Sequence, residues 1–100
     1  MAKKTMRAKK NLIVVAYDVS DDKRRNRIVK LLLKYGSRIN FSVFECILTD
    51  SQLVQLKEDI QSKMNQKEDI VVYYPICVKC YTKVYYQRPA EPKHETVKVL

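Results

Sequence analysis

The feature that most constrains this chain is a short apolar run that ends on a carboxylate. Residues 12–17 (LIVVAY) are apolar or aromatic, Asp18 follows them, and a strongly basic segment begins at Lys23. A run this short and rich in β-branched residues favours a strand buried on at least one face, because a helix would need more length. We expect a helix to begin in the segment after it, so Asp18 lies where the strand ends and the chain turns. Acidic and cationic side chains gathered at a strand end suit metal-assisted chemistry on a phosphate backbone.

The positive charge is concentrated in the first part of the chain. The 100 residues carry a formal net charge of +9, and residues 1–40 hold twelve of the twenty Lys and Arg but only three of the eleven acids. Such a one-sided field is typical of a protein that binds DNA or RNA, although charge that only keeps the protein soluble is the alternative. With 46% hydrophobic residues, the length allows one small domain with a thin core, which association with another chain would help to stabilise.

Apolar stretches and cysteines bear on where the protein works. No apolar stretch approaches the roughly 20 residues that span a bilayer, so we expect no membrane partner. Cys46, Cys77 and Cys80 cannot all pair within one chain, which favours reduced thiols and a cytoplasmic location. Residues 1–10 (MAKKTMRAKK) are predicted to be a basic, disordered extension.

A helix is predicted over residues 21–35, with apolar side chains on one face and Gly36 at the C-terminal stop position. On the opposite face, cations recur at helical spacing and form what we call the cationic stripe, namely Lys23, Arg27, Lys30 and Lys34. A continuous row of positive charge predicts contact with a nucleic-acid backbone, because phosphate contacts supply most of the sequence-independent affinity.

The middle of the chain predicts strand pairing followed by a second helix. Residues 38–48 alternate like a strand, and Glu45 interrupts the apolar side, which indicates a bulge or a sharp bend between two short strands. Thr49 and Gln52 have the spacing of a capping box, in which each side chain accepts a backbone N–H at the start of a helix. We therefore expect a helix directly after this pair.

The last third completes the expected architecture. Residues 69–76 and 80–86 are predicted to be strands, and a proline-flanked link then leads to a short alternating segment at residues 95–100. This order predicts an α+β sandwich in which both helices cover one face of a sheet. The other face would stay bare and apolar, so a second copy of the chain is expected to cover it.

Two stretches, residues 15–25 (VAYDVSDDKRR) and 34–45 (KYGSRINFSVFE), resemble the signature blocks of the CRISPR-associated protein two family. The similarity extends through residues 74–77 (YPIC) and 80–84 (CYTKV), so it covers residues 12–86. The combination of these blocks at these spacings is specific to the family, whereas an aromatic residue followed by aspartate alone would not be.

The resemblance implies a fold, an assembly and a function. The fold is a ferredoxin-like βαββαβ sandwich over residues 11–88, and the assembly is a two-fold homodimer. Residues 89–100 would form a proline-flanked link and an additional C-terminal strand that pairs with the partner chain. The function is that of a CRISPR adaptation protein, a Mg²⁺-dependent nuclease for RNA or DNA that acts with the CRISPR integrase in spacer acquisition.

The resemblance also gives roles to individual residues. Asp18 matches the acidic residue that holds magnesium in the family, so it is the predicted catalytic residue and metal ligand. The predicted nucleic-acid-binding residues combine matched positions with the cationic stripe: Tyr17, Lys23, Arg25, Arg27, Lys30, Lys34, Arg38 and Phe44. Mg²⁺ commonly uses only one or two carboxylates and keeps several waters, so one Asp18 from each of two chains meets its need.

Alternatives stay open at this point. Asp18 or Ser20 could simply cap the first helix. The only histidine, His94, lies in the proline-rich tail, so no general base accompanies the strand end. A non-catalytic DNA-bridging scaffold of the integrase complex, or a toxin ribonuclease of the related VapD type, are therefore the competing functions. The Cys77 and Cys80 pair would need further ligands to bind zinc, so packing is its expected role.

Overall fold

The computed structural model describes residues 9–88, which form a four-stranded sheet and three helices. In chain order the elements are β1 (Lys10–Asp18), α1 (Asp22–Leu33), β2 (Gly36–Asn40), β3 (Val43–Thr49), α2 (Asp50–Lys63), β4 (Ile70–Ile76) and α3 (Val78–Tyr81). The first six follow the ferredoxin-like βαββαβ plan, as predicted. Lys10, which the sequence assigned to the basic extension, is the first residue of β1, whereas residues 1–8 and the predicted C-terminal strand lie outside the described residues.

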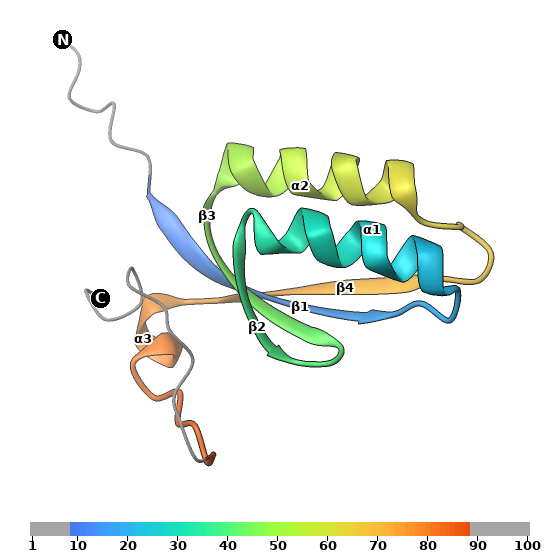
Figure 1. The fold of residues 1–100 in the computed structure, drawn as a ribbon. Helices are drawn as coiled ribbons and strands as arrows, with labels where there is room; N and C mark the ends of the chain where they lie inside the picture. Colours follow the sequence, from blue (N-terminus) through green and yellow to red (C-terminus); the bar gives the residue numbers. More distant parts are fainter. Residues whose placement is uncertain (1–8, 89–100) are drawn as a thin grey trace, which may run out of the picture.

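The sheet is antiparallel throughout, in the order β2-β3-β1-β4, so β2 and β4 are its edges. Figure 1 shows α1 and α2 together on one side of this sheet, and α3 with the chain after it away from them. We call the two sides the helix-covered face and the open face. Within residues 9–88, no helix is long and apolar enough to cross a membrane.

The core lies between the helix-covered face and the two long helices. Val15 of β1 is paired with Phe44 of β3, and both side chains are completely buried together with Cys46. The helices contribute the buried side chains of Ile28, Leu32, Leu56 and Ile60. The start of α2 follows the sequence prediction, because Thr49 is its N-cap and the reciprocal capping-box bonds are both present.

The end of α1 differs from the prediction. The helix stops at Leu33, and Gly36 opens β2 instead of serving as a helix stop. No glycine within residues 9–88 has a positive φ, so the cap conformation that favours glycine is absent there. A Cβ atom at Gly36 would overlap the backbone oxygen of Glu45 and lie 2.7 Å from Cys46 Sγ. Glycine is required here because β2 approaches β3 closely.

The hairpin between β2 and β3 turns four residues earlier than expected. The turn lies at Phe41 and Ser42, and the pairing of the two strands shifts between Arg38 and Asn40. Glu45 does not mark the bend but lies inside β3, where it is only 7% exposed. Its neighbours along the strand face the helices, so the Glu45 side chain belongs to the open face.

The strand predicted over residues 80–86 is wrong. The short helix α3 begins instead, because Cys77 caps it and its Sγ accepts the N–H of Cys80 at 3.4 Å. The backbone N–H of Tyr81 donates to the oxygen of Cys77 at 2.8 Å and closes the first turn. These local hydrogen bonds use backbone groups that strand pairing would need, and residues 82–88 continue without a strand.

The open face is covered only in part by this segment. The Tyr86 hydroxyl donates to Glu45 Oε1 at 2.5 Å, and the Tyr81 side chain is 8% exposed. Further along the face, on the edge strand β4, Ile70 is 57% and Tyr74 52% exposed. Apolar side chains therefore stay open to solvent along β4, from Ile70 opposite Asp18 to Tyr74 opposite Val14.

Candidate functional site

Asp18 is the last residue of β1 and is exposed. Its strand neighbour Tyr17 enters the core, so alternation turns Asp18 to the open face, where it pairs across the ladder with Ile70. Within residues 9–88, the carboxylate has no hydrogen bond or ion pair. An exposed carboxylate without a protein partner is available to a ligand.

The structure answers whether Asp18 caps the first helix. The N-cap of α1 is Asp21, whose side chain accepts the N–H of Arg24 at 2.9 Å. Asp22, in the first turn, pairs with the guanidinium of Arg25. Neither Asp18 nor Ser20 is the cap, so the purely structural role for Asp18 that the sequence left open is wrong.

Arg25 holds the loop between β1 and α1. Its Nη1 donates to the backbone oxygen of Val19 at 3.0 Å and lies 3.4 Å from that of Ser20, while Nη2 contacts Asp22. The guanidinium thereby fixes the chain just after Asp18. Arg25 and Arg38 are the predicted cationic contacts to nucleic acid for which the structure gives hydrogen bonds to the protein itself, and those of Arg38 run to Asn40 and Phe41.

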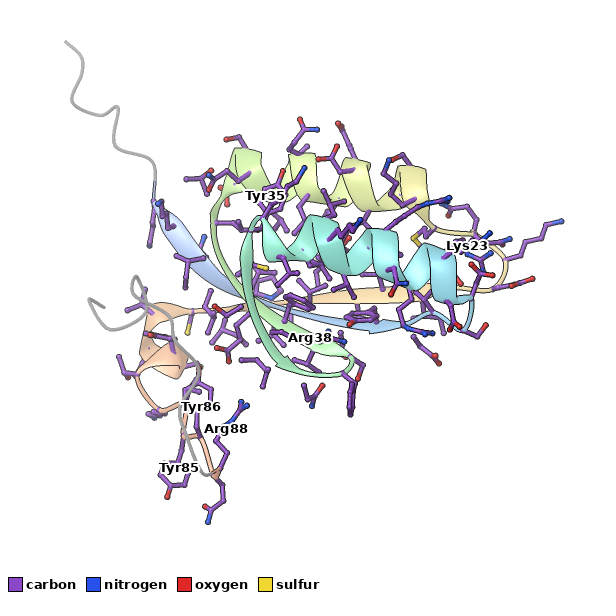
Figure 2. The ribbon with its side chains drawn as sticks, viewed as in Figure 1. Lys23, Tyr35, Arg38, Tyr85, Tyr86 and Arg88 are labelled. Carbon is purple, nitrogen blue, oxygen red and sulfur yellow. The ribbon has the colours of Figure 1, made fainter. Side chains whose placement is uncertain are left out.

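Arg38 of β2, labelled in Figure 2, forms one cluster with Tyr17 and Phe44 beside the β2–β3 hairpin. The Arg38 guanidinium carbon lies 5.9 Å from the ring centroid of Phe44, and its Nη2 lies 3.5 Å from the Tyr17 hydroxyl. The two rings are 6.2 Å apart. The structure thus brings together three residues that are up to 27 positions apart in the sequence.

The predicted contact role of two aromatic residues needs correction. Phe44 is completely buried and Tyr17 is 5% exposed. The Tyr17 hydroxyl donates to the backbone oxygen of Phe41 at 2.5 Å, and its N–H donates to Ser42 at 3.0 Å. Both rings are part of the core, so they position the hairpin and Arg38 and do not present a surface to a nucleotide.

The cationic stripe is exposed along α1, as predicted from its spacing. A shallow groove of about 260 Å³ lies against it, and the residues that line it are Arg27, Lys30, Leu31, Lys34 and Lys63. Lys63 comes from the last turn of α2 and was missed by the sequence analysis, because nothing in the sequence says which turns of two helices lie side by side. Four cations on one groove without an acidic lining residue suit an anion.

An ion pair that the sequence analysis also missed fastens α1 to the start of β4. Arg24 Nε donates to Asp69 Oδ2 at 2.8 Å and its Nη2 reaches Oδ1 at 3.1 Å, with Glu68 also at 3.1 Å. The Asp69 side chain is fully buried. Hydrogen bonding from Arg24 lowers the pKa of Asp69 below its ordinary value, against the effect of burial. The ion pair holds the first turn of α1 beside the start of β4, the strand that pairs with Asp18.

Metal binding can be tested against the donors that are present. Among residues 9–88, no group of three or more His, Cys, Asp or Glu side chains could hold an ion. Zinc needs about four ligands, and within the described part of the chain Cys77 and Cys80 have no such set around them. Mg²⁺ needs only one or two carboxylates and keeps several waters, so the exposed Asp18 fits it as a ligand.

Comparison with known proteins identifies a family. A family model described as CRISPR associated protein Cas2 matches residues 11–84. A relative from Rhodospirillum rubrum, named CRISPR-associated endoribonuclease Cas2 4, is 39% identical over 70 residues, which is 70% of this chain and 56% of the relative. The match thus spans little more than half of that relative's length.

Solved structures agree with the sequence comparison. The Cas2 structure of Streptococcus pyogenes is 28% identical with a TM-score of 0.69, and the match covers 77% of this chain and 99% of that one. A chain in the structure described as a partial Cas6-RT-Cas1–Cas2 complex is 26% identical with a TM-score of 0.63, covering 77% and 90% respectively. The fold and the matched region are therefore those of one family.

Proposed function

The chain belongs to the CRISPR-associated protein Cas2 family, and from this membership we propose that it is a Mg²⁺-dependent nuclease of CRISPR adaptation. It would cut phosphodiester bonds in RNA or DNA and act beside the CRISPR integrase during spacer acquisition. The observation that carries the proposal is Asp18, an exposed carboxylate at the end of β1 with no partner within residues 9–88. The endoribonuclease name of the Rhodospirillum relative and the Cas1–Cas2 assembly of the structural neighbour support it.

The proposed active unit is a homodimer formed through the open face. Asp18 lies on that face opposite Ile70 of β4, and Tyr74 lies four residues further along that strand; a second copy would remove both exposed side chains from water. Because a two-fold axis repeats each residue, two Asp18 carboxylates would approach each other when the axis passes near the end of β1. Two carboxylates close together repel, and a bound cation relieves the repulsion.

The residues of the site would divide the work. Two Asp18 side chains would hold Mg²⁺, which when bound polarises a phosphate oxygen and activates a water. Exposed cations of α1, such as Arg27 and Lys30, would neutralise the phosphate backbone of the bound nucleic acid away from Asp18. Arg25 would keep the loop after Asp18 in place through its bond to Val19. Residues 9–88 contain no histidine that could serve as a general base, so we expect slow hydrolysis.

A second candidate function is a non-catalytic scaffold that bridges DNA within the integrase complex. It is favoured by the groove of Arg27, Lys30, Lys34 and Lys63, which offers a broad cationic surface, whereas residues 9–88 hold no cluster of three metal-ligating side chains. Membership of the Cas2 family favours these two functions over a VapD-type toxin.

The first prediction separates the two candidates by removing one charge. In Asp18→Asn, cleavage of RNA, single-stranded DNA and duplex DNA in the presence of Mg²⁺ should fall at least 100-fold, because a metal ligand is lost. The matched control is Asp21→Asn, which removes the same charge three residues away while Asn still caps α1. That variant should cleave within about twofold of the wild type, by analogy with neutral surface changes.

The two functions give different outcomes. Loss of cleavage in Asp18→Asn alone, with unchanged DNA affinity and sedimentation, supports the nuclease. A wild type that binds DNA and bridges the integrase but cleaves nothing with Mg²⁺ makes the scaffold correct. Cleavage that persists in Asp18→Asn contradicts the role of Asp18.

A further inference from the structure

The β2–β3 hairpin presents an aromatic ring to solvent at its tip. Phe41 is 88% exposed, more than any other large apolar side chain within residues 9–88. The alternation of the sequence predicts the same strand face for Phe41 as for Val43, but the turn takes Phe41 out of the strand. A single exposed apolar side chain needs no explanation by itself. The surroundings of Phe41 do need one, because hydrogen bonds fix the backbone of this residue and the Arg38 guanidinium lies beside its ring. We call this arrangement the frame of Phe41.

Hydrogen bonds from three residues fix the backbone that carries Phe41. The backbone oxygen of Phe41 accepts the Tyr17 hydroxyl at 2.5 Å and Arg38 Nη2 at 3.1 Å. Arg38 Nε donates to the oxygen of Asn40 at 3.2 Å, and the Asn40 side chain accepts the N–H of Ser42 at 2.9 Å. Since the turn is ordered before any ligand arrives, ordering it costs little on binding.

A cation lies beside the exposed ring. The guanidinium carbon of Arg38 is 5.9 Å from the ring centroid of Phe41, within the range of a cation–π contact. A depression of about 320 Å³ is lined by Arg38, Ile39, Asn40 and Phe41, and none of these is acidic. An aromatic surface next to a fixed positive charge matches a nucleotide, which offers a flat base and a phosphate.

The position of the hairpin tip relates this frame to Asp18. The N–H of Tyr17 donates to the oxygen of Ser42 at 3.0 Å, so the turn lies against the residue that precedes Asp18. A base held on Phe41 would therefore belong to a strand that passes the end of β1. A protein partner fits less well, because the frame offers only Ile39 and Phe41 as apolar contacts, whereas a stable interface needs a wide buried area.

We propose that Phe41 and Arg38 form a binding site for an unpaired nucleotide, with the base stacked on the Phe41 ring and a phosphate held by the Arg38 guanidinium. The site rests on the proposed function and makes it more specific, since a base can stack on Phe41 only when it is not paired inside a duplex. The protein thereby prefers single-stranded or frayed segments next to Asp18 over continuous duplex.

The experiment compares Phe41→Ala with the wild type on two ligands. One is a 20-nucleotide oligo(dT) that carries a single 2-aminopurine, and the other is a blunt duplex of the same length. Affinity for the single strand should fall about 5- to 100-fold, as expected for the loss of one base–aromatic stack. Duplex affinity should stay within about twofold of the wild type, because it depends on backbone charge. Quenching of 2-aminopurine by the wild type should disappear in the variant.

Matched variants control for the loss of an exposed ring and for the fold. Tyr85 is 79% exposed, and Figure 2 shows it far from Arg38, so Tyr85→Ala should leave single-strand affinity unchanged. Phe41→Trp keeps a flat aromatic surface and should restore both affinity and quenching. The melting temperature of Phe41→Ala should equal that of the wild type, since the ring contributes almost no buried area.

Each result separates this inference from the function on which it rests. If the wild type binds neither ligand, the proposed function fails. If the wild type binds both and Phe41→Ala binds the single strand equally well, the stacking site is wrong and the function stands. An equal loss on both ligands, or weaker self-association in sedimentation with unchanged single-strand affinity, also overturns the stacking site, and the latter assigns the ring to a second copy.

Discussion

The two faces of the sheet differ in what completes them. On the helix-covered face, Val15, Phe44 and Cys46 are all fully buried by α1 and α2 of the same chain. On the open face, Ile70 and Tyr74 are more than half exposed although both belong to the same sheet. One face is therefore finished within a single chain, whereas the other is left for additional polypeptide or a ligand.

The two faces differ in whether they accept charged side chains. The core under the two long helices is built from apolar and aromatic side chains, as close packing requires, and the buried Asp69 at its margin is paired with Arg24 of α1. The open face accepts charge, with Asp18 at one end and Glu45, bound to Tyr86, in the middle. Stability is concentrated on the first face. Of the residues that we connect with function, Asp18 lies on the second face, Phe41 at the hairpin tip, and the cationic stripe on the outer surface of α1.

The largest effect expected from this comparison is the loss of Phe44. Phe44→Ala should destabilise the fold by about 3–5 kcal/mol, because it removes a fully buried ring and leaves a cavity between β3 and the helices. Urea unfolding followed by circular dichroism measures the change. Tyr74→Ala on the open face is the control, and it should change unfolding little but weaken self-association in sedimentation. Equal destabilisation by both variants would remove the distinction between the faces.

A smaller effect is expected at the polar contact of the open face. Tyr86→Phe removes one hydroxyl that donates to Glu45 and should cost about 1.5 kcal/mol, at the low end for a hydrogen bond to a charged group. Hydrogen exchange should also become faster in residues 77–88, which this contact holds to the sheet. Tyr85→Phe removes an equivalent hydroxyl from a side chain that is 79% exposed, and it should change neither quantity. Unchanged exchange in Tyr86→Phe would mean that other contacts hold the segment.

The smallest effect concerns thiol reactivity, which separates the buried Cys46 of the core from the exposed Cys77 and Cys80 without any substitution. Burial raises the pKa of Cys46 to about 12, whereas hydrogen bonds from Cys80 lower the pKa of Cys77 below its ordinary value. At pH 8, a thiol reagent should modify Cys77 first, the exposed Cys80 more slowly because Cys77 raises its pKa, and Cys46 only on unfolding. Mass spectrometry counts the labels, and three equally fast labels would contradict the buried position of Cys46.

The same cysteine gives a pH dependence with a defined sign. The pKa of Cys46 is higher in the folded chain than its ordinary value of 9.0, so folding favours the neutral thiol. The corresponding stability is present below pH 9 and decreases as the pH rises towards 12, because the unfolded thiol ionises first. Asp69 has the opposite sign, since its lowered pKa makes stability fall as the pH drops below the ordinary value of 3.8.

Local patterns predicted the parts of the fold that local chemistry determines. The Thr49 and Gln52 capping box and the apolar run into Asp18 needed only neighbouring residues, and both elements are where the sequence indicated. The strand expected over residues 80–86 failed because Cys77 caps a helix, which β-rich composition does not reveal. The sequence singled out Gly36 as a helix stop, but glycine is needed there because β3 approaches β2 too closely for a side chain.

The sequence predicted which single residues of the site are exposed, but not the contacts that residues distant in the sequence make with one another. Asp18 and the cationic stripe follow from position and spacing, and the structure leaves them exposed. The pairing of Arg24 with Asp69 spans 45 residues, and the approach of Lys63 to α1 depends on helix packing. Phe44 and Tyr17 were expected to touch nucleic acid, but an aromatic residue in a strand has the same pattern whether it faces a ligand or the core.

The edge position of β4 has a consequence for aggregation. An unpaired strand edge offers free N–H and C=O groups, on which further chains can stack into an open-ended fibre. β4 carries Pro75, which has no N–H to donate, yet its ladder with β1 continues past Pro75 to Ile76. This is the pattern of an edge-strand proline whose nitrogen faces outward. A single incoming strand can still pair along the residues before Pro75, but the interrupted edge is a poor template for endless growth.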